Sequence, residues 1–255
     1  MYSSGVSNYG VGRVLSTIHT LLVAGGWSYL GDIASNHSVF SSIGLSGSDN
    51  VIVAIDNTLA DRVGFRGGSA YANGTKILSN PTTSRYIQLS STAAMPYWLF
   101  YDLDRFIFVI KNFTNYGYTL SYNGLLDRYD LGNTMCSLIT GALSYSAVPI
   151  GAAHGATFTG GLGALVCDHV GAFNTLYDAC SLNCCFGVSQ LPNPIDGKLI
   201  MSPILVGKAI TAIQGTLKNM FSLQNAEIAS EDVVINGLDE YVCFLIYTYK
   251  ICILK

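Results

Sequence analysis

The segment 97–111 constrains the fold more than any other part of the chain, because it has the pattern of a complete β-hairpin. Its first half is YWLFY, its second half is RFIFVIK, and Asp102-Leu103-Asp104 separates the two. Aromatic and β-branched residues favour extended strands, and a short polar break between two such runs is typical of a tight turn. The segment therefore predicts two antiparallel strands joined at 102–104.

Shorter β-prone runs lie on both sides of this hairpin, separated by Gly, Ser, Asp and Asn. The turn dipeptide Asn123-Gly124 predicts that the chain changes direction into 125–129, and Asn236-Gly237 predicts a turn before the last strand. Together the runs predict a mainly β fold, an antiparallel β-sandwich or barrel-like meander. The predicted strands are 39–43, 51–55, 63–65, 87–89, 118–122, 199–206, 210–213, 233–235 and 241–249.

One amphipathic helix is predicted at 9–24, near the N-terminus. Apolar residues recur there at three- and four-residue spacing, and Gly25-Gly26 follows where a left-handed C-cap is expected. No repeat or linker divides the chain, so we expect a single domain over 1–255. The apolar residues of the helix are Val11, Val14, Leu15, Ile18, Leu21 and Leu22.

The stretch 132–192 is rich in Gly, Ala and Cys, and its first half, 132–163, has little periodicity. We expect an irregular insertion in the sheet or a contact arm. Between Asp130 and Asp168 the chain has no Asp, Glu, Lys or Arg, which is also a property of membrane segments. Because Pro149, several glycines and many Ser and Thr interrupt every apolar run, we expect no membrane-spanning helix.

Charged residues are scarce. The chain has 13 Lys+Arg and 16 Asp+Glu in 255 residues, or 11%, against about 25% in ordinary soluble proteins. A surface built from Ser, Thr, Asn, Gly and 16 Tyr is similar to a protein–protein contact surface. An ordinary protein with a neutral surface is the alternative. The net charge of −3, without a basic cluster, argues against direct nucleic-acid binding.

Cysteine and histidine are close together in one region. Cys167-x-His169 precedes Cys180, Cys184 and Cys185, which would be suitable zinc ligands, but this spacing fits no common zinc module. The first residues do not have the pattern of a secretion signal, so we expect folding in the cytoplasm. We therefore expect most of the seven cysteines to be small core residues, without a bound metal, and an alternative is that some oxidise after cell lysis.

No catalytic motif is found. The histidines His19, His37, His154 and His169 are scattered, and no G-x-S-x-G elbow accompanies them. The carboxylate pairs Asp102/Asp104 and Glu231/Asp232 would suit a glycosidase, but both occur in predicted turns, where Asp caps backbone N–H groups. Gly160-Gly161-Leu162-Gly163 lacks the Lys-Ser/Thr of a phosphate loop. Exposed aromatic residues would suit sugar binding, but Trp98 is on a predicted strand and is expected in the core. We expect no catalytic, cofactor or metal site.

Several segments, taken in order, resemble a family of virion structural proteins from tailed bacteriophages. The stretch 132–192 and the tail 250–255 depart from the family pattern. The matching residues are strand hydrophobics, turn formers and Tyr, so no functional residue can be transferred. The segments are LVAGGW (22–27), DNVIVAID (49–56), YWLFYDLDRFIFVIK (97–111), NGLLDRY (123–129), MSPIL (201–205), GTLKNM (215–220) and SEDVVINGLDEYVCF (230–244).

The resemblance implies a non-catalytic particle subunit, assembled in the host cytoplasm and located in the virion. We expect a homo-oligomeric ring at the neck or upper tail, of the collar, gateway or tail-terminator kind, with portal, adaptor, tail-tube or sheath proteins as neighbours. Repeated contacts of this kind must close by rotation. A receptor- or glycan-binding appendage is the alternative, and a cell-wall hydrolase is a third hypothesis.

Overall fold

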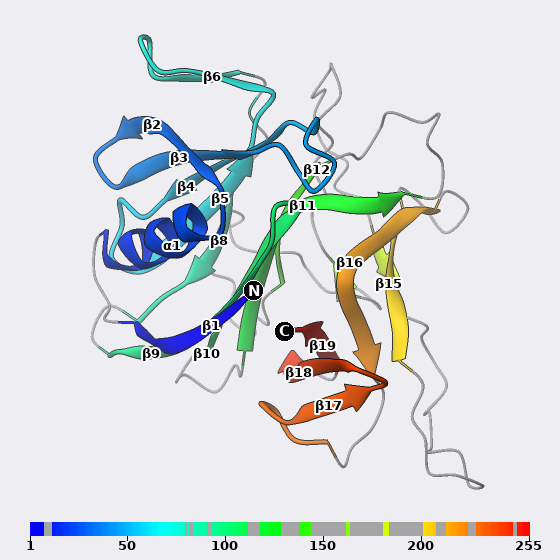
Figure 1. Cartoon of the computed structure of the whole chain (residues 1–255). Helices are drawn as coiled ribbons and strands as arrows, with labels where there is room; N and C mark the ends of the chain where they lie inside the picture. Colours follow the sequence, from blue (N-terminus) through cyan, green and yellow to red (C-terminus); the bar gives the residue numbers. More distant parts are fainter. Residues whose placement is uncertain are drawn as a thin grey trace, which may run out of the picture.

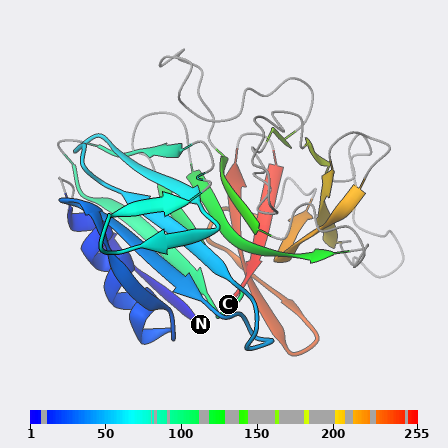
Figure 2. The same ribbon diagram turned by 90° about the horizontal axis from the view of Figure 1, so that it is seen from above.

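The computed structural model of the chain is mainly β, and its described part contains one helix (Figure 1). The strands form three layers that follow one another in Figure 2, and the two chain ends lie close together. The structure describes residues 1–7, 12–79, 81, 84–90, 93–111, 118–128, 138–143, 162–163, 181–183, 201–207, 213–223, 228–246 and 249–255.

The first layer is a five-stranded antiparallel sheet with the order β2-β3-β4-β5-β8. Its predicted members at 39–43, 51–55, 63–65 and 87–89 are confirmed, while β2 and a small separate hairpin, β6–β7, were not predicted. Alternate side chains such as Phe40, Val53 and Phe65 point into one core. The strands of the sheet are β2 (Ser28–Ala34), β3 (His37–Ser42), β4 (Val51–Asp56), β5 (Arg62–Gly67) and β8 (Arg85–Gln88). The separate hairpin consists of β6 (Ala70–Ala72) and β7 (Ile77–Ser79).

Helix α1 (Arg13–Ala24) packs against this sheet and buries Val14, Leu15, Ile18 and Leu22 in the same core. It begins later than the predicted 9–24, and residues 8–11 lie outside the described part. Gly26 has a φ of 92°, and the Trp27 N–H donates to Leu22 O at 3.0 Å. The left-handed glycine that ends the helix is therefore the second of the Gly25-Gly26 pair.

The second layer contains β1 (Tyr2–Ser7), β9 (Met95–Tyr101), β10 (Arg105–Lys111) and β11 (Tyr118–Arg128). The predicted 97–111 hairpin is confirmed, because Phe106 pairs with Tyr101 and Ile110 pairs with Tyr97. Phe106, Phe108 and Ile110 point toward the first layer, whereas Ile107 and Val109 point into a second core. This layer is therefore covered on both faces, which explains the continuous apolar run FIFVI at 106–110.

The turn predicted at Asn123-Gly124 is wrong, because β11 runs through both residues. Gly124 pairs with Arg105 of β10 and has a φ of 147°. A Cβ at this position would be 2.4 Å from Asp104 O and 2.5 Å from Arg105 Cα, so only glycine fits. Beyond it, β11 leaves β10 and pairs through Leu126 with β16. The glycine therefore allows one strand to pass between two layers.

The third layer follows from this change of partner and packs on the second core through Leu217, Met220, Phe244 and Ile251. The predicted strand at 233–235 is confirmed, and so is the described part of the strand at 199–206, which begins at 201. The segment 241–249 contributes to both β18 and β19, and residues 199–200, 210–212 and 247–248 lie outside the described part. The strands are β15 (Met201–Gly207), β16 (Ile213–Leu223), β17 (Val233–Asn236), β18 (Asp239–Ile246) and β19 (Tyr249–Leu254).

Three strands fall within the stretch predicted to be an irregular insertion. They are β12 (Leu138–Leu143), which pairs with β11, and the short pair β13 (Leu162–Gly163) and β14 (Ser181–Asn183), which continues the sheet beyond β15. These segments belong to the sheet. The remainder of the 132–192 prediction lies outside the described residues.

Candidate interaction surface

The carboxylate of Asp102 is used to close the β9–β10 turn. Its Oδ1 accepts the N–H groups of Asp104 at 2.8 Å and Arg105 at 3.0 Å, and its Oδ2 lies 3.4 Å from Arg105 Nη2. Both Arg105 and Asp104 are buried, and within the described part of the chain the Nε and Nη1 atoms of Arg105 have no hydrogen-bond partner. This is the backbone-capping role predicted for a turn aspartate.

Asp104 connects the layers. Its Oδ1 accepts the Leu45 N–H at 2.7 Å, and its Oδ2 accepts from Lys218 Nζ of β16 at 2.5 Å. Partial burial acts to lower the pKa of Lys218 and is the largest single effect. The hydrogen bond to Asp104 and the negative charges of Asp104 and Asp127 together outweigh it and leave this pKa above its ordinary value. Lys218 therefore stays charged, and the two side chains form a structural ion pair.

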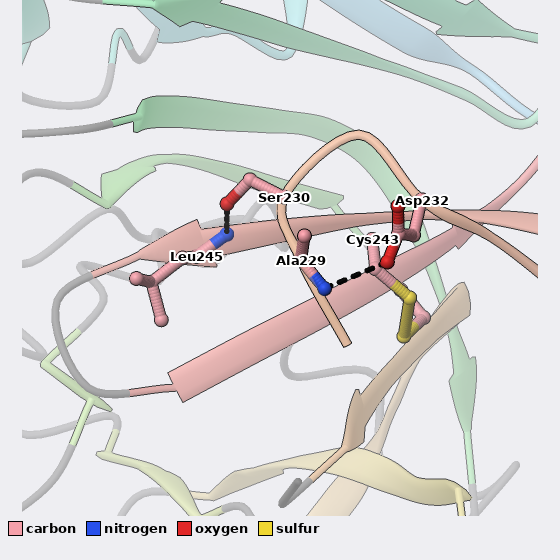
Figure 3. Close-up of a disulfide and its surroundings, with 6 residues drawn as sticks. Ala229, Ser230, Asp232, Cys243 and Leu245 are labelled. Atoms are coloured by element: carbon pink, nitrogen blue, oxygen red, sulfur yellow. Dashed lines mark hydrogen bonds between the residues drawn. A yellow bond between two sulfur atoms is a disulfide. The ribbon is translucent and has the colours of Figure 1, made fainter. Parts of the chain in front are cut away.

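The second carboxylate pair, Glu231 and Asp232, is divided between different partners. Glu231 accepts hydrogen bonds from Lys111 Nζ at 2.7 Å and from the Tyr118 hydroxyl. Burial acts to raise the pKa of Glu231, yet these two bonds lower it below its ordinary value. Asp232 Oδ2 accepts the Ala229 N–H at 2.7 Å, as Figure 3 shows. Each carboxylate therefore has a structural partner.

His37 is the centre of a small polar cluster that the sequence did not indicate. It pairs with Asp56 across β3 and β4, and its Nε2 lies 3.5 Å from Arg66 Nη2. Burial lowers the pKa of His37, so the imidazole is neutral near pH 7. His19 is half-buried on the helix, where it packs on Tyr29 and Phe40. Trp98 is in the core, as predicted.

The remaining sequence candidates lie outside the described residues, apart from the strand backbone at 162–163 and 181–183. These candidates are His154, His169, Gly160–Gly163 and the Cys167–Cys185 cluster. Within the described ranges, no three His, Cys, Asp or Glu side chains gather closely enough to hold a metal. In the same ranges, no helix has the length and apolar character needed to cross a membrane.

Cys243 and Cys252 form a disulfide between β18 and β19 (Figure 3). Both are fully buried, as expected for core cysteines, and the sequence did not predict that this pair is bonded. The N–H of Cys243 donates to Asp232 O and its C=O accepts from Glu231 N, so both groups point away from β19. The cysteines therefore occupy a non-hydrogen-bonded pair, where side chains approach most closely, and their Cα atoms are 4.1 Å apart.

The disulfide anchors the base of the β17–β18 hairpin, which carries exposed apolar side chains. The exposed fractions are 46% for Val233, 69% for Ile235 and 102% for Leu238. In Figure 1, β17 is the outermost strand of this part of the sheet, and within the described residues it pairs with β18 alone. An apolar strand with an open edge is a site for strand pairing with another chain. We call Val233–Leu238 the hairpin edge.

Comparison with known proteins does not assign the chain to a family, because it matches no family model and no curated protein.

Proposed function

We propose that the chain is a non-catalytic structural subunit that assembles with copies of itself, as a ring component at the neck or upper tail of a tailed-phage particle. Its partners would be neighbouring virion proteins of the portal, adaptor, tail-tube or sheath kind. The resemblance of the segments from LVAGGW to SEDVVINGLDEYVCF supports the virion context.

The observation that carries the assembly proposal is the hairpin edge. It combines exposed Val233, Ile235 and Leu238 with an open strand edge, in a chain with only 11% charged residues. Long-lived contacts can bury neutral polar and apolar groups without the desolvation cost of unpaired ions. A surface of this composition is suitable for a subunit that remains bound to other chains.

The hydrogen bonds of the four candidate carboxylates favour a structural role over a role in hydrolysis. Asp102, Asp104, Glu231 and Asp232 each accept hydrogen bonds from turn N–H groups or from lysines that join the layers. A glycosidase pair would instead face each other across a cleft, at about 5 to 10 Å. The buried disulfide is compatible with a particle that acts outside the reducing cytoplasm.

The proposal is tested by mass photometry and sedimentation velocity of the purified full chain over a range of protein and salt concentrations. We expect one discrete species at a whole multiple of 27.3 kDa, six or twelve times by analogy with neck rings. Because its contacts are mostly uncharged, the species should persist at high salt. A monomer under every condition, or a continuous distribution of sizes, would contradict the proposal.

A further inference from the structure

The backbone of β17 presents a defined set of hydrogen-bonding groups on its open edge. Cys243 N–H donates to Asp232 O at 2.9 Å, so odd-numbered residues of β18 point their N–H and C=O groups toward β17. In the register of the hairpin, Tyr241 then bonds Val234. The N–H and C=O groups of Val233 and Ile235 therefore point away from β18, along the outer edge.

The same two residues carry exposed side chains. Val233 and Ile235 lie on one face of the strand, because side chains alternate along it, and both are β-branched. Charge, proline and bulges are the usual means by which natural edge strands avoid pairing. The strand itself, VVIN, has no charged residue and no proline, and its register with β18 is unbroken.

We propose that β17 pairs with β17 of a second copy of this chain, antiparallel and around a two-fold axis at Val234. In this register Val233 lies opposite Ile235 of the second copy, and Ile235 lies opposite Val233. All four outward groups on each strand are then satisfied, and apolar side chains meet on one face. A shift of the register by two residues is less favourable in either direction. One shift would place Val233 opposite Gly237, which lies in the turn, and the other would place Ile235 opposite Glu231, whose N–H already donates to Cys243 O.

The charges near the edge tolerate this register. Asp232 would lie opposite the neutral Asn236 of the second copy, and Glu231 is already paired with Lys111 at 2.7 Å. Like charges do not face each other in any of the new cross-strand pairs. A second copy therefore fits the edge in shape, hydrogen bonding and charge.

The pairing assigns one contact between copies of the chain, and its biological role rests on the proposed function. It is isologous, so by itself it closes as a dimer, and ring contacts would use other surfaces. A four-residue strand pair buries less than the roughly 1,000 Å² of a stable interface. The dimer should therefore form and dissolve with protein concentration unless further contacts support it.

The test uses single cysteines in the full chain, analysed by non-reducing gel under mild oxidation. At the two-fold axis, Val234 faces itself in a non-hydrogen-bonded pair with Cα atoms about 4.5 Å apart, within the span of a disulfide. We expect Val234→Cys to give a reductant-sensitive dimer at twice 27.3 kDa. Leu238→Cys is the control, because it is fully exposed but lies in the turn, and the parent chain measures the background of the seven native cysteines.

A second variant, Ile235→Pro, removes one outward N–H without removing a bond to β18. It should abolish the concentration-dependent association through β17 in sedimentation velocity, whether that association joins two single chains or two rings, while near-ultraviolet circular dichroism stays like that of the parent. Equal cross-linking of Val234→Cys and Leu238→Cys, or a dimer that survives Ile235→Pro, would overturn the pairing. Larger assemblies without the Val234→Cys cross-link would overturn only the pairing, whereas a monomer in every assay would also remove the proposed function.

Discussion

Loss of the Cys243–Cys252 disulfide should cost a predictable amount of stability. The two cysteines are 9 residues apart in sequence, and the chain-entropy relation for a loop of this size gives about 2.6 kcal/mol at about 25 °C. The cross-link acts mainly on the unfolded chain, because the β18–β19 register already holds the cysteines together in the folded state. At a typical denaturant slope, this energy corresponds to roughly 1 M in the urea midpoint.

The assay is equilibrium urea unfolding, followed by tryptophan fluorescence and circular dichroism, with and without a phosphine reductant. The parent chain should lose about 2.6 kcal/mol when reduced. The double variant Cys243→Ala/Cys252→Ala is the matched control, since it keeps the other cysteines but cannot form this bond. Its midpoint should not respond to reductant.

Two outcomes would refute this reasoning. If reductant leaves the parent midpoint unchanged, the bond does not constrain the unfolded chain as the loop relation requires. If reductant shifts the parent and the double variant equally, the sensitivity belongs to other cysteines, and the pair on β18 and β19 contributes nothing measurable.

Three further predictions concern a glycine, an ion pair between layers and a buried histidine. Gly124→Ala should destabilise the fold by about 1–3 kcal/mol in urea unfolding, because the added Cβ would lie 2.4 Å from the backbone of Asp104. Gly74→Ala is the control and should be neutral, because no atom lies within 4 Å of a Cβ at that position. Equal effects of the two substitutions would contradict the role of Gly124. Asp104→Asn should cost about 1.5–3 kcal/mol, because it removes the nearer and more buried of the two carboxylates beside a partly buried lysine. Asp127→Asn, at 3.6 Å from the same lysine and more than half exposed, should change stability by less than about 1 kcal/mol. Reversal of this order would refute the layer-joining ion pair. Burial lowers the pKa of His37, so the unfolded chain binds a proton at this imidazole more tightly than the folded chain does. The stability contributed by the neutral imidazole should therefore be complete above about pH 6.5 and should fall as the pH drops below that value. In His37→Gln the urea midpoint should depend less on pH than in the parent.

Local pattern predicted many of the strands because neighbouring residues are sufficient to specify them. The 97–111 hairpin contains two β-prone runs and its own turn, so its pairing needs no distant partner. Gly124 shows where local pattern fails. Asn123-Gly124 is a turn signal in isolation, but here the glycine permits a close approach to Asp104 and Arg105, and the strand continues.

Fewer of the contacts at the candidate surface than of the strands could be predicted from the sequence. The turn positions of Asp102 and Asp104 correctly predicted capping, yet nothing local indicated that Lys218, distant in sequence, would complete an ion pair with Asp104. The disulfide was missed for a related reason. Cys243 and Cys252 become neighbours only because the β18–β19 register places them opposite each other in a non-hydrogen-bonded pair.

By itself, the sequence determined that this chain is mainly β, where many of its strands lie, and that charge is scarce on its surface. These properties depend on residues a few positions apart. Tertiary structure alone decided that the second layer is buried on both faces and that β11 crosses to a third layer at Gly124. It also decided that, among the strands that the structure describes, β17 pairs only with β18, beside a buried disulfide. Each of these depends on contacts between distant segments, whose pairing is set by the packing of the whole chain.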